Sequence, residues 1–586
     1  MKALKYSVLL GLLATLSAPA QTNQTPPPVG QTSDEKLKEQ AKLQGQVVNQ
    51  VTGEPVRKAN ITLRPEGGGT NLKAATDNDG KFTIENIDPG RYTLAAERQG
   101  FVSGNYGASR PLGPGTPLDL KKSQVMKDIS FKMTPQGIIA GKILDDEGEP
   151  VSGVNVQVLQ YRYMMGKKRL IPAVQGLVMS NDLGEFRAPN LSPGRYYVAT
   201  SPQKLMDIQS GVERSAAKSD EGLITTFYPN AADASSASPV EVGPGAEVRG
   251  IDLRLRKAKV FRISGKVMNA VTGTPMNPAM LMVYKREAGG MSTIPVSMYM
   301  VQGDKGAFEL RNVPPGPYAL LAVSTNPQDL MVQMTSVDVG DQDIENMVIN
   351  VGGGFELPVT AKLEGVPAQA DQDPSNNDQN KAKTPPPGPD LSKIRIVLNL
   401  EDNPLAGLAT TQLDKDGKGV IKRVNPDKYK FIAAGLPDGT YLKGARYGDR
   451  DALESGLDLS AGAGGTLQLT IGSPAAQLTG VVHNEKGEPV SGAVVTLVPK
   501  DAKGRNDLSR TGSTDQNGNL RMFGIVPHEY NVFAWEDIEA GAADDDDFRK
   551  PFDSKGTYVK LTEGAKNNVQ LTVITRAQVE EEKAKR

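Results

Sequence analysis

The side chains that most often carry out chemistry are scarce in this sequence. It has no cysteine and only two histidines, His483 and His528, among 586 residues. Without cysteine, disulfides, iron–sulfur ligation and thiol nucleophiles are excluded. A zinc hydrolase needs a His-x-x-Glu pair and a second histidine, but the histidines stand in His483-Asn484-Glu485 and His528-Glu529. The sequence also lacks the serine-hydrolase motif Gly-x-Ser-x-Gly and a complete phosphate-binding loop. It predicts no catalytic residue, no metal centre and no cofactor.

Clustered carboxylates are a second kind of candidate, because Ca²⁺ prefers oxygen ligands. The densest cluster is an acidic run, which we interpret as a solvated loop or as a weak cation patch: Asp544, Asp545, Asp546 and Asp547. Two turns that begin at Asp77 and Asp414 start like calcium-binding loops. Both carry lysine at the fifth position and lack glutamate at the twelfth, so they are predicted to be hairpin turns.

Exposed aromatic rings are a third kind, because they can stack on sugar rings and anchor interfaces. Trp535 is the sole tryptophan and alternates with Phe533, so it either packs in a core or stacks on a ligand. Tyr161 and Tyr163 precede the basic triplet Lys167-Lys168-Arg169 on a predicted hairpin, where they either pack on an edge strand or stack on a ligand.

The elements that would position these side chains recur five times along the chain. Each copy begins with glycine and β-branched residues, turns at Gly-x-Pro, turns again at an Asx/Gly cluster and closes at Pro-Gly-x-Tyr, although the fourth copy is degenerate. We place the closing tyrosines at Tyr92, Tyr196, Tyr318, Tyr441 and Tyr530. Residues such as Ala59, Ile61 and Leu63 alternate with polar neighbours, as in half-buried antiparallel strands. The copies therefore predict an all-β protein, a tandem array of about five antiparallel β-sandwich domains.

The repeats divide the chain into predicted segments. Residues 1–20 have the positive, apolar and Ala-x-Ala regions of a signal peptide, and residues 21–41 form a linker. The predicted sandwiches span 42–134, 135–257, 258–352, 353–473 and 474–575, followed by a charged tail, 576–586. Polar residues 366–391 are predicted to be a disordered insertion in the fourth sandwich, and residues 204–220 are a possible helix.

The order Gly-x-Val, Gly-x-Pro-Val, Asp-x-x-Gly-x-Phe and Pro-Gly-x-Tyr resembles the carboxypeptidase regulatory-like domain, a transthyretin-like or Cna-B-like sandwich. Multi-copy arrangements of this kind are similar to exported acidobacterial proteins. The resemblance implies a fold that accompanies a catalytic domain in metallocarboxypeptidases and performs no hydrolysis itself. It also implies membership of a carbohydrate-binding-like group of sandwiches.

Composition limits the possible partners. The net charge of −1 gives no general attraction to nucleic acid or anionic membranes. The 62 glycines and 41 prolines together make up a larger share of the 586 residues than the average of about 12%, which indicates frequent turns.

We expect a non-enzymatic protein, periplasmic, outer-membrane-associated or extracellular, without an integral membrane segment once the signal is removed. It would act as a spacer or scaffold for an unknown envelope protein. The alternative is a carbohydrate-binding protein that recognises polysaccharide through loop aromatics.

Overall fold

The chain folds into five β-sandwiches, as the repeats predict. The computed structural model describes residues 39–585 apart from 112, 165, 175, 205–220, 288–289, 302–304, 325–330, 366–389, 402–408, 463, 503–504 and 506. The predicted signal peptide, most of the linker, the possible helix at 204–220 and most of the 366–391 insertion lie outside the described residues. The strands that flank this insertion are β28 (Phe355–Glu364) and β29 (Arg395–Leu400).

Each sandwich is built from consecutive strands. The first contains β1 (Ala41–Asn49), β2 (Asn60–Pro65), β3 (Leu72–Ala75), β4 (Lys81–Ile87), β5 (Gly90–Glu97), β6 (Gly104–Asn105), β7 (Leu118–Leu120) and β8 (Val125–Met133). The second contains β9 (Gly137–Leu144), β10 (Val154–Met164), β11 (Lys167–Pro172), β12 (Val178–Met179), β13 (Glu185–Leu191), β14 (Gly194–Lys204), β15 (Glu221–Ile224), β16 (Thr226–Phe227), β17 (Val240–Val242), β18 (Glu247–Val248), β19 (Leu253–Arg254) and β20 (Arg256–Lys259). The third contains β21 (Phe261–Asn269), β22 (Ala279–Glu287), β23 (Gly290–Val301), β24 (Ala307–Val313), β25 (Gly316–Ser324), β26 (Val332–Val339) and β27 (Ile344–Val351).

The last two sandwiches also carry short helices. The fourth contains β28 (Phe355–Glu364), β29 (Arg395–Leu400), β30 (Ala409–Gln412), β31 (Lys418–Val424), β32 (Lys428–Ala434), β33 (Tyr441–Tyr447), β34 (Arg450–Asp451), α3 (Ala452–Ser455), β35 (Leu457–Asp458) and β36 (Leu467–Gly472). The fifth contains β37 (Ala476–His483), β38 (Val494–Pro499), β39 (Arg510–Ser513), β40 (Asn519–Ile525), β41 (His528–Trp535), α4 (Asp546–Arg549), β42 (Thr557–Leu561) and β43 (Lys566–Ile574). Helix α5 (Arg576–Ala584) follows it, so the charged tail is helical. No helix in the described ranges is long and apolar enough to cross a membrane.

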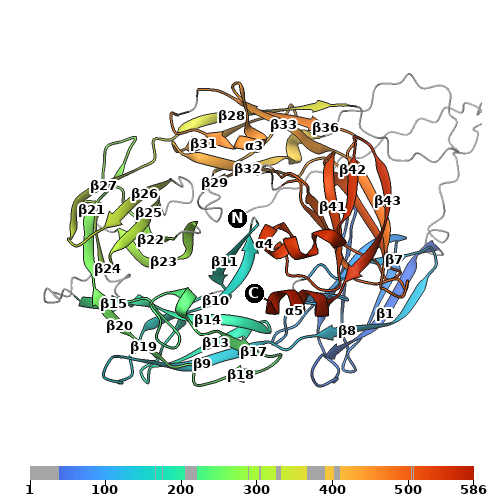
Figure 1. Ribbon diagram of the computed structural model, residues 1–586, viewed down its shortest axis with the longest axis horizontal. Helices are drawn as coiled ribbons and strands as arrows, with labels where there is room; N and C mark the ends of the chain where they lie inside the picture. Colours follow the sequence, from blue (N-terminus) through green and yellow to red (C-terminus); the bar gives the residue numbers. More distant parts are fainter. Residues whose placement is uncertain are drawn as a thin grey trace, which may run out of the picture.

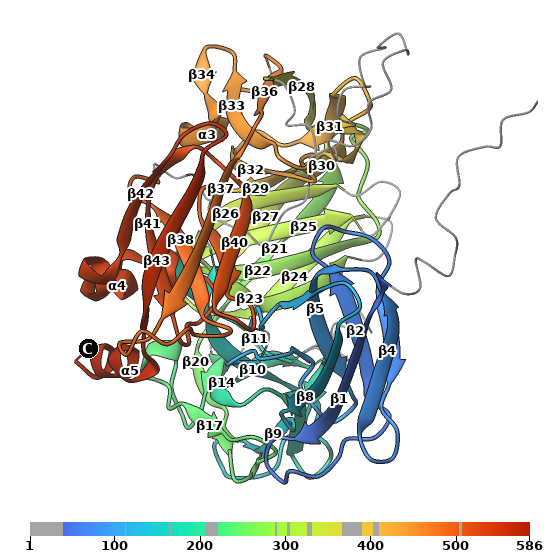
Figure 2. The same ribbon diagram turned by 90° about the vertical axis from the view of Figure 1, so that its right-hand side faces the viewer.

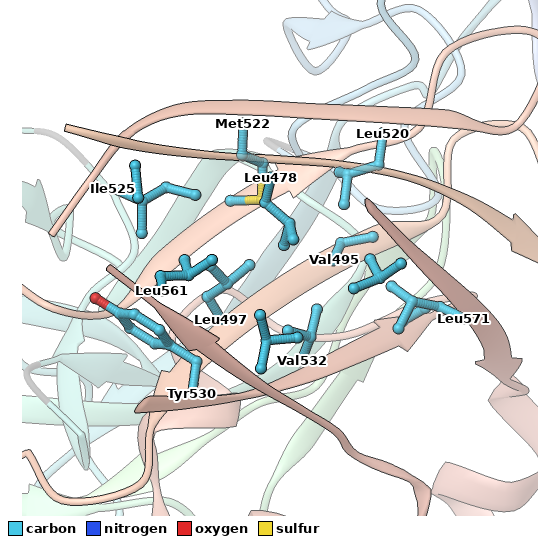
Figure 3. Close-up of a cluster of buried hydrophobic side chains, with 14 of the residues drawn as sticks. Leu478, Val495, Leu497, Leu520, Met522, Ile525, Tyr530, Val532, Leu561 and Leu571 are labelled. Carbon is cyan, nitrogen blue, oxygen red and sulfur yellow. The ribbon is translucent and has the colours of Figure 1, made fainter. Parts of the chain in front are cut away.

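The strand pairing is antiparallel except where the first strand of each sandwich pairs with its last strands, and except for a short parallel pair between β41 and β43. In the first sandwich, β1 pairs antiparallel with β4 and parallel with β8. The equivalent parallel pairs are β9 with β18 and β19, β21 with β27, β28 with β36, and β37 with β43. The second sheet of each sandwich is built on an antiparallel pair such as β2 with β5 or β38 with β41. Alternating apolar residues from the two sheets fill each core, as Figure 3 shows for the fifth sandwich.

The glycine that opens the repeat is required by this parallel pair. A Cβ atom on Gly265 would lie 1.9 Å from the carbonyl oxygen of Met347 on β27, and one on Gly141 would lie 1.9 Å from that of Ile251. Gly265 also pairs across the sheet with Phe308. In the fourth sandwich the equivalent cross-strand pair is Val359 with Gly419. There the glycine stands on the partner strand, so the opening glycine of the repeat is absent from the fourth copy.

The Asx/Gly clusters form the predicted turns. Asp77 Oδ1 accepts hydrogen bonds from the backbone nitrogens of Asp79 and Lys81, at 2.9 and 2.8 Å. Asp414 Oδ1 accepts from Asp416 and Lys418 in the same way, at 2.9 and 2.8 Å. These carboxylates cap their own turns, as expected for Asx turns.

The closing tyrosine fixes a corner in every sandwich. Its hydroxyl donates to the carbonyl four residues earlier, in the pairs Tyr92 to Asp88, Tyr196 to Ser192, Tyr318 to Pro314, Tyr429 to Asn425 and Tyr530 to Val526. The prediction of Tyr441 for the fourth copy is therefore wrong. Tyr429 lies in the core of the fourth sandwich, whereas Tyr441 belongs to that of the fifth.

The corner tyrosines predict a loss of stability in alkali. Burial raises the pKa of Tyr196 and Tyr318 to about 12, and it also raises the pKa of Tyr530. Because the folded-state pKa exceeds the unfolded value of about 10, the stabilising effect is complete below pH 10 and is lost as pH rises towards 12. We expect tyrosinate absorbance and loss of the strand signal in circular dichroism to rise together in this window. Full titration of these tyrosines in a folded chain would contradict the prediction.

The five sandwiches are arranged in a closed ring (Figure 1). The fifth lies beside the first, and both views show this neighbourhood (Figures 1 and 2). Neighbours in the sequence also touch: Asn425 Nδ2 donates to Val332 O between the fourth and third, and Tyr441 Oη donates to Glu563 at 3.3 Å between the fourth and fifth. The array therefore closes on itself and does not extend as a rod.

Candidate functional site

The centre of the ring holds most of the side chains that the sequence singled out. After β41 the chain leaves its sheet as a helical insertion, residues 536–556, which contains α4, before returning as β42. Helices α4 and α5 project over the centre of the ring on one face, and the β10–β11 hairpin of the second sandwich reaches the same place (Figures 1 and 2). This region is therefore the candidate site.

An apolar cluster, here called the central cluster, joins the insertion to its own sheet. Its buried members are Val494, Val498, Phe533, Trp535, Ile538, Ala542, Ala543, Phe548, Phe552, Ile574 and Val579. The ring of Trp535 lies 5.2 Å from that of Phe552, edge to face, and 6.0 Å from that of Phe548. Val579 comes from α5, so the cluster also holds the C-terminal helix.

Trp535 lies in the middle of the central cluster and is 0% exposed. Its indole nitrogen donates a 2.9 Å hydrogen bond to Thr496 Oγ1 on β38. A buried indole whose donor is satisfied has no free face for a sugar ring. The stacking interpretation of Trp535 is therefore wrong, and the core interpretation describes its position.

Tyr161 and Tyr163 are half-buried on β10 and make ring contacts within the chain. Tyr161 packs edge to face against Tyr197, with centroids 5.2 Å apart, and Lys168 Nζ lies 5.3 Å from its ring centroid. Tyr163 packs against Phe548 of the fifth sandwich at 6.1 Å. The predicted ligand-stacking tyrosines thus use their rings on neighbouring side chains, and Tyr163 connects two sandwiches.

The acidic run lies in the insertion and is partly helical, not an extended solvated loop. Asp545 is the N-cap of α4, because its side chain accepts a 2.9 Å hydrogen bond from the nitrogen of Phe548. Asp546 forms an ion pair with Arg549 although its side chain is 87% exposed, and Asp544 and Asp547 are exposed as well. Among the described residues, no group of three or more histidine, cysteine, aspartate or glutamate side chains is placed to hold a metal ion.

The basic hairpin faces this acidic insertion. A Cβ on Gly166, at the tip of the β10–β11 hairpin, would lie 3.0 Å from the carbonyl oxygen of Asp544. Burial raises the pKa of Glu539, and the positive charges of Arg162, Arg110 and Lys168 act in the opposite direction. The basic residues and the acidic insertion therefore complement each other within one chain.

These contacts predict that calcium has no effect on stability. A ligand that binds only the folded state raises the melting temperature, but Asp545 and Asp546 already serve a helix cap and an ion pair. We expect the same melting temperature with and without millimolar Ca²⁺ in calorimetry, with Mg²⁺ as the control for ionic strength. A rise that is specific to Ca²⁺ would restore the cation patch.

The two histidines occupy structural positions on different strands of the fifth sandwich. His483 ends β37 and forms an isolated bridge with Pro489. His528 begins β41, where its Nε2 lies 2.9 Å from the carbonyl oxygen of Asp501 and its ring contacts Tyr530.

The sequence did not predict a group of ion pairs that lies at the start of the helical insertion. Asp537 is 3% exposed and forms ion pairs with Arg110 of the first sandwich and with Arg576 at the start of α5, the latter at 2.6 Å. In the sequence Asp537 lies shortly before the acidic run. No local pattern could have indicated a partner 427 residues away.

Several solved structures and one protein family are similar to parts of this chain. No curated protein matches the chain. Among solved structures, it is similar to the Bacillus anthracis TIE protein (11% identity, TM-score 0.16, covering 53% of this chain and 51% of that one). It is also similar to a streptococcal ancillary pilin (14%, 0.15, 53% and 98%) and to the minor pilin GBS52 of Streptococcus agalactiae (13%, 0.22, 37% and 96%).

The sequence profile of the carboxypeptidase regulatory-like domain matches residues 42–124. These residues run from β1 to the turn before β8, and include the Asx turn at Asp77 and the tyrosine corner at Tyr92. The first sandwich of the chain is therefore similar to the carboxypeptidase regulatory-like domain.

Proposed function

We propose that the chain is a non-enzymatic, exported scaffold of the cell envelope that arranges five sandwiches in a ring and presents their outer loops to a protein partner. One observation carries this proposal: the described side chains best suited to chemistry either order the helical insertion of the fifth sandwich or join one sandwich to another. Trp535 and Asp545 order the helical insertion, Tyr163 docks on it, and Asp537 binds the first sandwich.

The family that the first sandwich resembles supports a role without catalysis, because its name describes a regulatory-like domain and a fold by itself does not supply a reaction. The predicted signal peptide at 1–20 supports export. Polysaccharide recognition is not proposed, since Trp535 is buried and Tyr161 and Tyr163 make contacts within the chain.

The test is photo-crosslinking of the purified chain, residues 21–586, in envelope and cytoplasmic extracts of the source cell. We expect one envelope protein to be captured in a fixed ratio and to be displaced by excess unlabelled chain. The same preparation is screened on a glycan array and for peptidase activity. Saturable polysaccharide binding, chelator-sensitive hydrolysis or the absence of a displaceable envelope partner would overturn the proposal.

A further inference from the structure

The contact between the first and fifth sandwiches closes the ring, and it is made by polar groups. Asp119 and Gln516 exchange two hydrogen bonds, from Asp119 N to Gln516 Oε1 at 3.1 Å and from Gln516 Nε2 to Asp119 O at 3.2 Å. Arg91 Nη2 donates to the carbonyl of Ser513 at 3.0 Å. These partners are about 400 residues apart in sequence, so only the ring brings them together.

Asp537 is the most buried charged group of this contact. Its carboxylate accepts one hydrogen bond from Arg110 Nε, across the contact, and pairs through its other oxygen with Arg576 of its own sandwich. Beside it, Ser109 Oγ donates to the carbonyl of Glu536 at 3.1 Å. Because the Asp537 side chain is only 4% exposed, its bond to Arg110 is little screened by solvent.

The junctions of the fourth sandwich with the third and with the fifth are more apolar than this contact. Tyr441 of the fourth sandwich is a member of the buried core of the fifth. Met334 of the third sandwich packs against the core of the fourth. Among the residues that the structure describes, the buried cores of the first and fifth sandwiches have none in common. A polar contact without a shared core resembles a transient domain interface, whereas a shared core does not.

We propose that the contact between the first and fifth sandwiches is a latch, with Asp537 as its central residue, and that its release converts the closed ring into an open chain of sandwiches. Each sandwich keeps its own core when the latch opens, so opening does not require unfolding. Closure within one chain is favoured because the covalent connection holds the two faces at a high effective concentration. Opening also separates Tyr163 from Phe548, the aromatic contact between the second and fifth sandwiches.

The chain is well suited to a direct test, because it has no native cysteine to compete with introduced labels. Spin labels at Val125→Cys on β8 and Phe523→Cys on β40 report the distance between the two sandwiches. These residues are 51% and 61% exposed and lie outside the contacts described above. In the parent chain we expect one narrow distance distribution from pulsed electron resonance.

The latch is opened by Arg110→Ala, which leaves Asp537 paired with Arg576. Hydrogen bonds to charged groups are among the stronger net interactions, so we expect the open fraction to rise about tenfold or more, with a broad, longer distribution and a larger radius of gyration. Gln516→Ala removes the second polar contact and should shift the distribution in the same direction.

The matched control is Arg262→Ala. Arg262 donates two hydrogen bonds to Asp343 Oδ2 at 2.9 and 2.7 Å, but this pair lies within the third sandwich. Circular dichroism and hydrogen exchange verify that every variant keeps its strands. The latch is disproved if Arg110→Ala and Gln516→Ala both keep the narrow distribution, or if Arg262→Ala broadens it equally.

Discussion

Gly265→Ala is expected to destabilise the third sandwich by about 3 kcal/mol, the upper part of the range for overpacking. The added methyl group would stand 1.9 Å from the backbone oxygen of Met347 and 2.7 Å from its carbonyl carbon. A backbone obstacle cannot rotate away as a side chain can, so β21 and β27 must separate. The parallel pair that joins the two ends of the sandwich is then lost.

The measurement is hydrogen exchange across a urea series, because five sandwiches do not unfold as one two-state unit. Protection should fall first in β21 and β27. Gly340→Ala, in the same sandwich, is the matched control, since no described residue lies within 4 Å of its added Cβ atom; it should change stability by no more than about 0.5 kcal/mol. Equal effects of the two substitutions would refute the close-approach explanation.

Trp535→Ala is expected to cost the fifth sandwich about 3 to 5 kcal/mol, the range for removing a large aromatic side chain from a core. The indole contacts Phe533, Phe548 and Phe552, so its removal leaves a cavity between the sheet and the insertion. It also leaves Thr496 Oγ1 without its indole donor. The helical insertion should detach before the sheet unfolds.

Calorimetry and hydrogen exchange of α4 and α5 measure this effect without tryptophan fluorescence, which the substitution abolishes. Phe523→Ala is the control in the same sandwich, because that ring is 61% exposed. We expect its melting temperature to stay close to that of the parent. An unchanged melting temperature in Trp535→Ala would show that the central cluster contributes little to the fold.

The sequence predicted the structural features that depend on residues close together in the chain. The strands, the Asx turns and four of the five closing tyrosines follow from local patterns of alternation and turn chemistry. The fourth tyrosine was misplaced because Pro437-Asp438-Gly439-Thr440-Tyr441 resembles the closing motif, whereas the true corner, Asn425-Pro426-Asp427-Lys428-Tyr429, lacks its glycine. Only the hydrogen bond and the core distinguish the two.

The candidate site could not be assembled from sequence, because its parts come from distant segments. Trp535, Tyr163 and Asp545 were each singled out for separate chemistry, and no pattern indicated that they share one place. The bond from Arg110 to Asp537 depends on how five sandwiches turn the chain through a full ring. That path is set by the junctions between domains, for which alternation and turn motifs carry no signal.

The parallel pairing of first and last strands has a mechanical consequence. In the fifth sandwich, β37 and β43 run side by side from the pair Gln477–Lys566 to the pair His483–Thr572. Tension on the two ends of such a domain pulls these strands in opposite directions along their length, so the ladder of hydrogen bonds is loaded in shear and must break together. A stretched chain would first lose its ring and then resist as a series of shear-loaded domains.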